Sequence, residues 1–307
     1  MPVGRYAPSP TGTLHVGNLR TAIAAWLWSR HDDSAFRMRF EDHDRHQAAA
    51  EHEAAQLRDL AALGLDWDEP ITRTSDRWDR YTEVLHDLIA RDLTFPCWCS
   101  RRDIREAVAA PHAPVDGYPG TCRDLDAAGR AARAAESRVE APSLRLRGGG
   151  EPVDFVDAVV GPVSGTVDDI VLRRGDGLPS YNLTVSVDEI DEGIEVVVRA
   201  DDLVPVTPAQ IRIIELLGGT PPTYAHVPLA VAPITGRRLA KRDGAVTLGE
   251  LEAVGWTAKG VRTELVRSLG LCGPDDVPSP AELVASFDPA ALIREPWTYD
   301  LDGREPW

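Results

Sequence analysis

The sequence predicts an α/β fold in which a parallel sheet is covered by crossover helices. An apolar, strand-like segment at residues 3–7 is broken by prolines and a glycine, and helical spacing follows from Leu19 to Ser29. The same order repeats when the alternating segment Phe36–Phe40 is followed by a helical pattern at residues 48–63 that Gly64 closes. Strand, helix, strand, helix is the order of parallel strands joined by helices.

Further along the chain the predicted elements change in kind. Apolar residues on one face predict a helix at residues 76–91, after which the periodicity breaks, and β-rich pieces alternate with Gly and Pro between residues 153 and 172. Residues 180–187 and 194–199 have the composition of core strands, and a helix is predicted at residues 208–217. Because core-strand composition returns in these residues, they are expected to complete the sheet that begins at the N-terminus.

These changes predict four segments. Residues 1–95 and 181–246 form the two halves of one nucleotide-binding sheet, and residues 96–180 are an insertion between them. Residues 247–307 form a short tail with helices predicted at 257–269 and 280–287 and without obvious chemistry. At 307 residues the chain is long for one compact core, which agrees with such a division.

The charge of the chain limits its partners. It carries 33 Lys and Arg against 49 Asp and Glu, a formal charge of −16, which argues against non-specific nucleic-acid binding. An RNA partner would have to meet a local patch, and residues 97–150 hold nine Arg against seven acidic residues. There is no signal-like N-terminus, no apolar run near the ~20 residues that span a bilayer and no disulfide framework, so we expect a cytoplasmic protein with no membrane partner.

Two distant elements are candidates for binding one triphosphate. His15 and Gly17 lie at the predicted start of the first helix, where backbone N–H groups and the helix dipole favour anions. Taken alone, His15 fits a surface helix cap better. Lys241, one of only two lysines, stands in the basic loop 238–242, and a compact ammonium suits phosphate as a point charge. Together they predict an enzyme that forms an adenylate from ATP and a carboxylic acid.

A group of cysteines forms a second candidate site. Three thiolates, from Cys97, Cys99 and Cys122, are typical of tetrahedral zinc, which needs a fourth ligand when it is structural. Ligand chemistry alone favours His112, because neutral imidazole binds zinc far more commonly than a phenol with a pKa near ~10. Unligated buried cysteines are the alternative. Cys272 stands alone in the tail and is predicted to be inert.

Several of these motifs, in this order, resemble the catalytic domain of class I glutamyl-tRNA synthetases. They are Arg5-Tyr6-Ala7-Pro8-Ser9-Pro10-Thr11-Gly12, His15-Val16-Gly17-Asn18 and Glu41-Asp42-His43-Asp44. The loop 238–242 resembles the KMSKS loop of that family, with Lys241 in the place of its second lysine. The resemblance covers about residues 3–245 and implies a Rossmann-type catalytic domain with a zinc-containing insertion and a short helical tail.

The resemblance also implies which residues bind the substrates and the metal. Glutamate is held by Arg5, Tyr6, Ala7, Pro8, Ser9, Glu41, Tyr181 and Arg199. ATP is held by His15, Gly17, Asn18 and Lys241, of which His15 and Lys241 are catalytic. Structural zinc (Zn²⁺) is held by Cys97, Cys99, Tyr118 and Cys122, so that Tyr118 replaces His112, and Mg²⁺ accompanies ATP.

These assignments agree with the chemistry of the side chains. Glu41 follows a strand at the carboxyl edge of the sheet and can pair with the substrate ammonium, while Arg5 and Arg199 can each take a carboxylate. Two positions depart from the family pattern. Ala240 replaces the usual serine of the loop, and Asn18 replaces the last residue of its motif, with loss of an imidazole.

The short tail distinguishes members of the family. About sixty residues follow the loop, fewer than the ~100 expected of a further domain. This resembles the glutamyl-queuosine tRNA(Asp) synthetases, and implies a monomer that activates L-glutamate without tRNA. The glutamyl group then passes to queuosine in the anticodon stem-loop of tRNA(Asp). Two alternatives are a short glutamyl-tRNA synthetase that charges the 3′ end of tRNA(Glu), and a non-catalytic synthetase-like RNA-binding protein.

Overall fold

The fold is centred on a five-stranded parallel sheet. The computed structural model describes residues 3–43, 48–108, 117–137, 139–233, 236, 239 and 246–299. Along the sheet the strands follow the order β10-β9-β1-β2-β3, and every pair is parallel. Their bounds are β1 (Gly4–Tyr6), β2 (Phe36–Phe40), β3 (Asp68–Arg73), β9 (Val196–Ala200) and β10 (Thr223–Val227). The winding reverses between β1 and β9, which is where ligands of such sheets bind.

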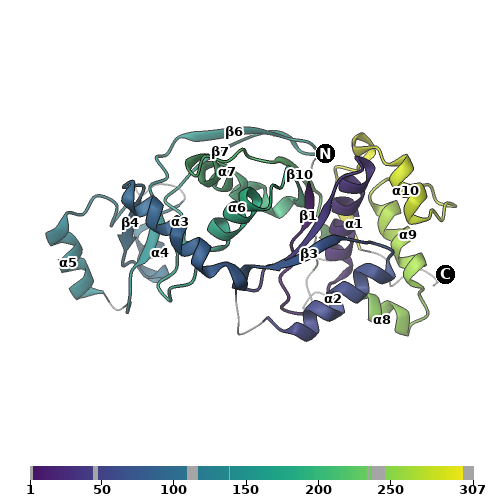
Figure 1. Ribbon diagram of the computed structural model, residues 1–307, viewed down its shortest axis with the longest axis horizontal. Helices are drawn as coiled ribbons and strands as arrows, with labels where there is room; N and C mark the ends of the chain where they lie inside the picture. Colours follow the sequence, from purple (N-terminus) through teal and green to yellow (C-terminus); the bar gives the residue numbers. More distant parts are fainter. Residues whose placement is uncertain are drawn as a thin grey trace.

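Helices cover both faces of this sheet, as the strand–helix order predicts. They are α1 (Val16–His31), α2 (Ala50–Ala62), α3 (Trp78–Ala90), α6 (Tyr181–Asp191) and α7 (Thr207–Leu216), with short 3₁₀ turns η1 (Thr74–Arg77) and η2 (Asp201–Val206). Val196 and Val198 of β9 pack into the core that contains α1, whereas Val197 packs into the core that contains α6 and α7. Side chains that alternate along β9 therefore pack into two buried layers. Figure 1 shows α1 on one side of the sheet and α6 and α7 on the other.

The segment 180–187 is a helix, so the strand predicted there is wrong. Ser180 caps α6, with its hydroxyl accepting the N–H of Leu183 at 3.4 Å. Seven residues of α6 are buried, including Leu183 and Val187. A short apolar run gives the same sequence pattern in a buried strand and in a buried helix, and β-branched residues favoured the wrong choice.

Two strands of the sheet have no clear sequence signal. The edge strand β3 contains Pro70 and three charged residues, and its pairing with β2 shifts register between Arg37 and Arg39. Proline is tolerated at a sheet edge because one side of the strand makes no ladder. β10, at the other edge, pairs with β9 over five residues from Thr223 to Val227.

The chain between α3 and α6 forms two small sheets of its own. The antiparallel sheet contains β4 (Thr94–Cys97), β5 (Ser143–Leu146) and β8 (Val171–Arg173), and the hairpin contains β6 (Pro152–Asp157) and β7 (Gly161–Thr166). Two helices, α4 (Arg101–Val108) and α5 (Ala127–Glu136), complete it. In Figure 1 α5 lies at the far end from the tail, while the hairpin passes over α7 toward β10. Ala158 N–H donates to Tyr224 at 2.8 Å, which ties the hairpin to the parallel sheet.

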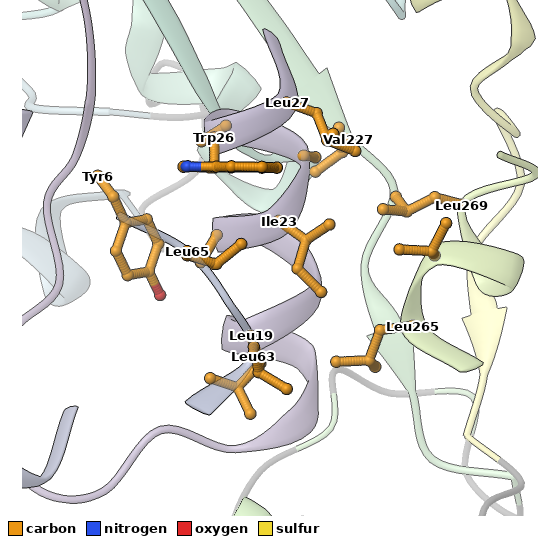
Figure 2. Packing of buried hydrophobic residues seen from close by; sticks show 14 of the residues in the cluster. Tyr6, Leu19, Ile23, Trp26, Leu27, Leu63, Leu65, Val227, Leu265 and Leu269 are labelled. Carbon is orange, nitrogen blue, oxygen red and sulfur yellow. The ribbon is translucent and has the colours of Figure 1, made fainter. Parts of the chain in front are cut away.

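The tail packs against the first helix. It contains α8 (Leu248–Ala253), α9 (Ala258–Ser268), α10 (Pro280–Ser286), η4 (Pro289–Ala291) and β12 (Trp297–Thr298), which pairs with β11 (Ala230–Val231). Figure 2 shows Leu265 and Leu269 beside α1, near Ile23 and Val227, and all four belong to one core. Buried Arg20 of α1 donates to Ser268 of α9 at 2.9 Å. The tail thus shares the core of the parallel sheet.

Across the ranges that the structure describes, no helix combines the length and the apolar character that crossing a bilayer requires.

Candidate active site

A cavity of about 490 Å³ opens at the carboxyl ends of β1, β2 and β9, at the reversal point of the sheet. Eight of the predicted binding residues line it: Tyr6, Ala7, Pro8, Ser9, His15, Asn18, Glu41 and Tyr181. Arg5, Gly17 and Arg199 do not line it, and Lys241 lies outside the described residues. The remaining lining residues are Thr11, Gly12, Thr13, Leu14, Thr21, Gln56, Ala200, Asp202 and Leu203.

His15 caps α1 and lines the cavity at the same time. Its Nδ1 accepts the N–H groups of Gly17 at 3.1 Å and Asn18 at 3.3 Å, and the Asn18 side chain accepts the His15 N–H at 3.3 Å. Because Nδ1 is an acceptor, the proton of the neutral ring is on Nε2. The cap therefore fixes the tautomer, in which Nε2–H is the donor of the ring.

Gly17 is required by the His15 ring. A Cβ at residue 17 would lie 2.9 Å from Cε1 of His15 and 3.2 Å from Cβ of Ala230. Contacts this short force the ring to move, so a glycine here preserves the cap as well as any close approach of a ligand.

Glu41 is the carboxylate that faces the cavity. It follows β2, its N–H donates to the Pro8 carbonyl at 3.0 Å, and it is 6% exposed. Its nearest cation is Arg39, at 3.7 Å, and within the described part of the chain its carboxylate accepts no hydrogen bond. Burial raises the pKa of Glu41 to about 7, against the opposing effect of Arg39.

Beneath Glu41 lies a buried ion network centred on Arg39, which is 0% exposed. Arg39 contacts Glu192 at 2.8 Å, Glu189 at 3.2 Å and Asp188 at 3.7 Å. With Glu41, four carboxylates thus surround one guanidinium. A ligand that brings a positive charge to Glu41 would add a counter-charge to this network.

Arg5 belongs to the same network rather than to the cavity lining. Its Nε and Nη2 lie 3.0 Å and 2.9 Å from the Glu189 carboxylate, and its Nη1 donates to the Val198 carbonyl at 3.3 Å. Glu189 in turn joins Arg5 to Arg39, and these two cations lower its pKa although burial opposes them. Arg5 would contact a substrate through those guanidinium N–H groups that do not bind Glu189 or the Val198 carbonyl.

Tyr181 lines the cavity from the start of α6, whereas Arg199 lies on β9, on the other side of β1 from β2 in the sheet order. Tyr181 begins α6, and burial, followed by the charge of Glu41, raises its pKa, whereas Arg199 opposes the rise. Arg199 is 6% exposed, and its Nε and Nη2 donate to His226 and Thr207 at 3.0 Å and 2.8 Å. The structure thus places a carboxylate, Glu41, and a guanidinium, Arg199, within electrostatic reach of one tyrosine.

The cysteines form a compact cluster away from this cavity. The sulfur atoms of Cys97, Cys99 and Cys122 all lie within 4.8 Å of one another, so the three could hold a metal ion. Tyr118 Oη lies 3.3 Å from the sulfur of Cys97 and 3.8 Å from that of Cys99. His112, the rival fourth ligand, lies outside the described residues.

The surroundings of the cluster favour a negative charge on Cys97, whereas the hydrogen bond with Cys97 raises the pKa of Cys99 and burial raises that of Tyr118. Arg133 Nη2 lies 3.8 Å from the Cys99 sulfur, and the Arg145 guanidinium lies 4.0 Å from the centre of the Tyr118 ring. A hydrogen bond with Cys99 lowers the pKa of Cys97 to about 4. Three thiols this close together are donors that a metal ion such as zinc can use.

Comparison with known proteins places the chain in a family. Residues 3–298 match the family described as tRNA synthetases class I (E and Q), catalytic domain. The chain belongs to this family. It is therefore a ligase, and both the predicted fold class and the resemblance drawn from the motifs are confirmed.

Relatives of this synthetase differ in how much of their length it covers. The glutamyl-Q tRNA(Asp) synthetase of Nocardia farcinica is 51% identical over 98% of this chain and 94% of its own length. Its namesake in Cutibacterium acnes is 46% identical over 92% of this chain and 79% of its own length. A glutamate–tRNA ligase of Coxiella burnetii is 36% identical over 96% of this chain but only 62% of its own.

A solved structure supports the fold. The glutamate tRNA ligase of Elizabethkingia meningosepticum, determined in complex with its amino acid, superposes with a TM-score of 0.81 at 22% identity. The match covers 98% of the synthetase described here and 67% of that chain.

The site contains residues that sequence reasoning missed. Gln56 of α2 is 1% exposed, and its amide donates to the carbonyls of Ser9 and Gly12 at 3.1 Å and 2.7 Å, which fixes the turn after β1. Glu189 and His226 contact the predicted arginines. A helical pattern gave no reason to single out Gln56. Glu189 lies between the segments 180–187 and 194–199, which have core composition, and a charged residue so close to core segments was an available signal.

Proposed function

We propose that this synthetase activates L-glutamate with ATP in the absence of tRNA and then transfers the glutamyl group to queuosine in the anticodon of tRNA(Asp). The observation that carries the proposal is a cavity at the reversal point of the sheet that His15, Glu41 and Tyr181 all line. The names of the Nocardia and Cutibacterium relatives support the choice of acceptor.

In this proposal the amino acid lies between Glu41 and Arg199. The substrate ammonium pairs with Glu41, whose nearest cation, Arg39, is 3.7 Å away and shared with three other carboxylates. The side-chain carboxylate pairs with Arg199. Residues 6–9 and Tyr181 line the cavity beside the amino acid. Arg5 stabilises the buried ion network next to the cavity through its contact with Glu189. Fixing both ends of glutamate orients its α-carboxylate for attack.

ATP takes the part of the cavity at the start of α1. An oxygen of the α-carboxylate bonds to the α-phosphorus as the bond to the bridging oxygen breaks, which gives glutamyl-adenylate and pyrophosphate. Nε2–H of His15 donates to the charge that develops on the α-phosphate, Gly17 and Asn18 contact the nucleotide, and Lys241 neutralises the departing pyrophosphate. Mg²⁺, bound with the nucleotide, supplies further charge neutralisation.

The second step takes place at the carbonyl carbon of glutamyl-adenylate. The oxygen of a hydroxyl of the modified base bonds to this carbon and gives up its proton to solvent, while AMP leaves with the electron pair of the broken anhydride bond. We propose that a cytoplasmic monomer performs both steps. We also propose that the chain is divided into the four predicted segments, with boundaries at residues 95, 180 and 246.

Isotope exchange tests the proposal directly. Incubating the protein with glutamate, ATP and labelled pyrophosphate, without RNA, should give prompt exchange into ATP, and Lys241→Ala should abolish it. Exchange that requires tRNA, with glutamate recovered on a terminal adenosine, would favour a short glutamyl-tRNA synthetase instead. No adenylate at saturating substrates would favour a non-catalytic RNA-binding protein.

We also propose that the cysteine cluster holds one structural zinc ion with Tyr118 as the fourth ligand. Zinc held there would tie β4 to the turn that carries Tyr118 and Cys122, and it takes no part in the chemistry. The purified protein should contain about one zinc per chain, and Cys97→Ser or Cys122→Ser should lose it together with thermal stability. Cys272→Ser, which changes a thiol far along the chain from the cluster, is the matched control.

The choice of fourth ligand has its own test. Tyr118→Phe should weaken zinc binding at least about tenfold in competition with a chelator, while His112→Ala should leave it unchanged. The reverse result would assign the position to His112.

A further inference from the structure

A line of three buried side chains joins the β6–β7 hairpin to the parallel sheet. A carboxylate oxygen of Asp157, at the end of β6, lies 2.6 Å from Nδ1 of His226 on β10. Nε2 of His226 lies 3.0 Å from Nε of Arg199 on β9. Asp157 is 1% exposed, His226 0% and Arg199 6%, so water does not screen these contacts.

Arg199 determines which nitrogen of His226 carries the proton. A guanidinium has donors only, so the contact at 3.0 Å requires Nε2 to accept. The ring is therefore neutral, and its Nδ1–H donates to Asp157. Burial lowers the pKa of His226, which agrees with a neutral ring. The other oxygen of Asp157 accepts the N–H groups of Val159 and Val160, each at 2.9 Å, so the carboxylate is itself fixed.

The remaining contacts of Arg199 fix its plane. Nη2 donates to Thr207 Oγ1 at 2.8 Å and to Gln210 Oε1 at 2.7 Å. Because the guanidinium is planar, bonds at Nε and Nη2 together set the direction of Nη1. Among the residues that the structure describes, Nη1 donates no hydrogen bond.

The charge of Arg199 lies 5.3 Å from the centre of the Tyr224 ring but has no carboxylate partner among the described residues. Arg5 and Arg39 contact the Glu189 carboxylate at 2.9 Å and 3.2 Å. By contrast, no carboxylate within the described ranges lies within 4.0 Å of Arg199, and its hydrogen-bond partners His226, Thr207 and Gln210 are all neutral. A buried cation without a counter-ion is unfavourable, so this site is suited to an anionic ligand.

We propose that Asp157 and His226 are positioning residues that hold Nη1 of Arg199 toward the side-chain carboxylate of the substrate. This inference rests on the proposed function, in which Arg199 binds glutamate, and it adds two residues that do not touch the substrate. It also gives the hairpin a role, because Asp157 lies outside the parallel sheet and yet sets the geometry of a group within it.

The first test measures the tautomer of His226 directly. ¹⁵N NMR of the histidine rings should show one ring, assigned by its loss in His226→Gln, as the Nδ1–H tautomer. In Asp157→Asn the backbone N–H groups hold the amide oxygen, so the amide NH₂ faces Nδ1 and should move the proton to Nε2, opposite the Arg199 donor. An Nε2–H tautomer in the native protein would overturn the proposal.

The second test separates the two nitrogens of His226. His226→Gln can place an amide oxygen near the position of Nε2 and keep an acceptor for Arg199, whereas His226→Asn keeps only a donor for Asp157. We expect the KM for glutamate in pyrophosphate exchange to rise about tenfold in His226→Asn and in Asp157→Asn, with the KM for ATP unchanged. His226→Gln should recover most of the affinity, and the exposed His86→Gln is the matched control.

Arg199→Ala distinguishes failure of this inference from failure of the proposed function. If Arg199→Ala raises the KM for glutamate but His226→Asn and Asp157→Asn do not, the positioning role is overturned while the function stands. If Arg199→Ala leaves the KM unchanged, glutamate is not bound there and the proposed arrangement itself fails. Equal losses in His226→Asn and His226→Gln, with the KM for ATP raised as well, would indicate a general structural role and contradict the proposal.

Discussion

Replacing His15 with alanine should lower the rate of glutamate-dependent pyrophosphate exchange by about 10²–10³-fold. The imidazole Nε2–H is a fixed donor at the cavity, and loss of one such donor to a developing charge has this typical cost. The same substitution removes the cap of α1 and should lower the free energy of unfolding by about 1 kcal/mol. Exchange kinetics and denaturant unfolding measure the two effects separately.

His15→Asn is the control that separates the cap from the chemistry. The asparagine oxygen can take the place of Nδ1 and accept the N–H groups of Gly17 and Asn18, but the side chain is too short to replace Nε2. The variant should unfold like the wild type and yet exchange as poorly as His15→Ala. Full exchange in His15→Asn would reduce His15 to a helix cap, the role that its local sequence favours when taken alone.

Glu41→Gln should raise the KM for glutamate by about 10²-fold or more. It removes the charge proposed to pair with the substrate ammonium in a buried site, and breaking such a pair typically costs about 2–5 kcal/mol. The KM for ATP should change little. Above pH 7 the free energy of unfolding of Glu41→Gln should be no lower than that of the wild type. Burial raises the pKa of Glu41, so its ionised form is unfavourable in the folded protein.

The pH dependence of glutamate binding follows from the same carboxylate. Protons and the substrate ammonium compete for Glu41, whose pKa is raised to about 7, so the ionised form declines as the pH falls through 7. The KM for glutamate of the wild type should rise by up to about tenfold per pH unit below 7 and level off above it. Glu41→Gln should lack this dependence, and a flat wild-type profile between pH 5 and 8 would contradict the role.

Features that depend on neighbours along the chain were predictable. The strand Phe36–Phe40 and the helices at the start of the chain and in the tail are found where period and capping indicate, because both act within a few residues. Residues 180–187 were misread because a helix buried on several sides has no polar face to reveal its period. The strands with proline or few apolar residues lacked a local signal as well.

The sequence by itself determined the family, the α/β order and the set of candidate residues, since ordered motifs and hydrophobic periods are properties of the linear chain. Only the tertiary structure decided which charges meet. Arg5 pairs with Glu189, 184 residues away, and His226 joins Asp157 to Arg199 across separations of 69 and 27 residues. Burial then shifts the pKa of Glu41 and fixes the protons on His15 and His226, because ionisation and hydrogen bonding depend on distance and solvent exposure, which packing alone sets.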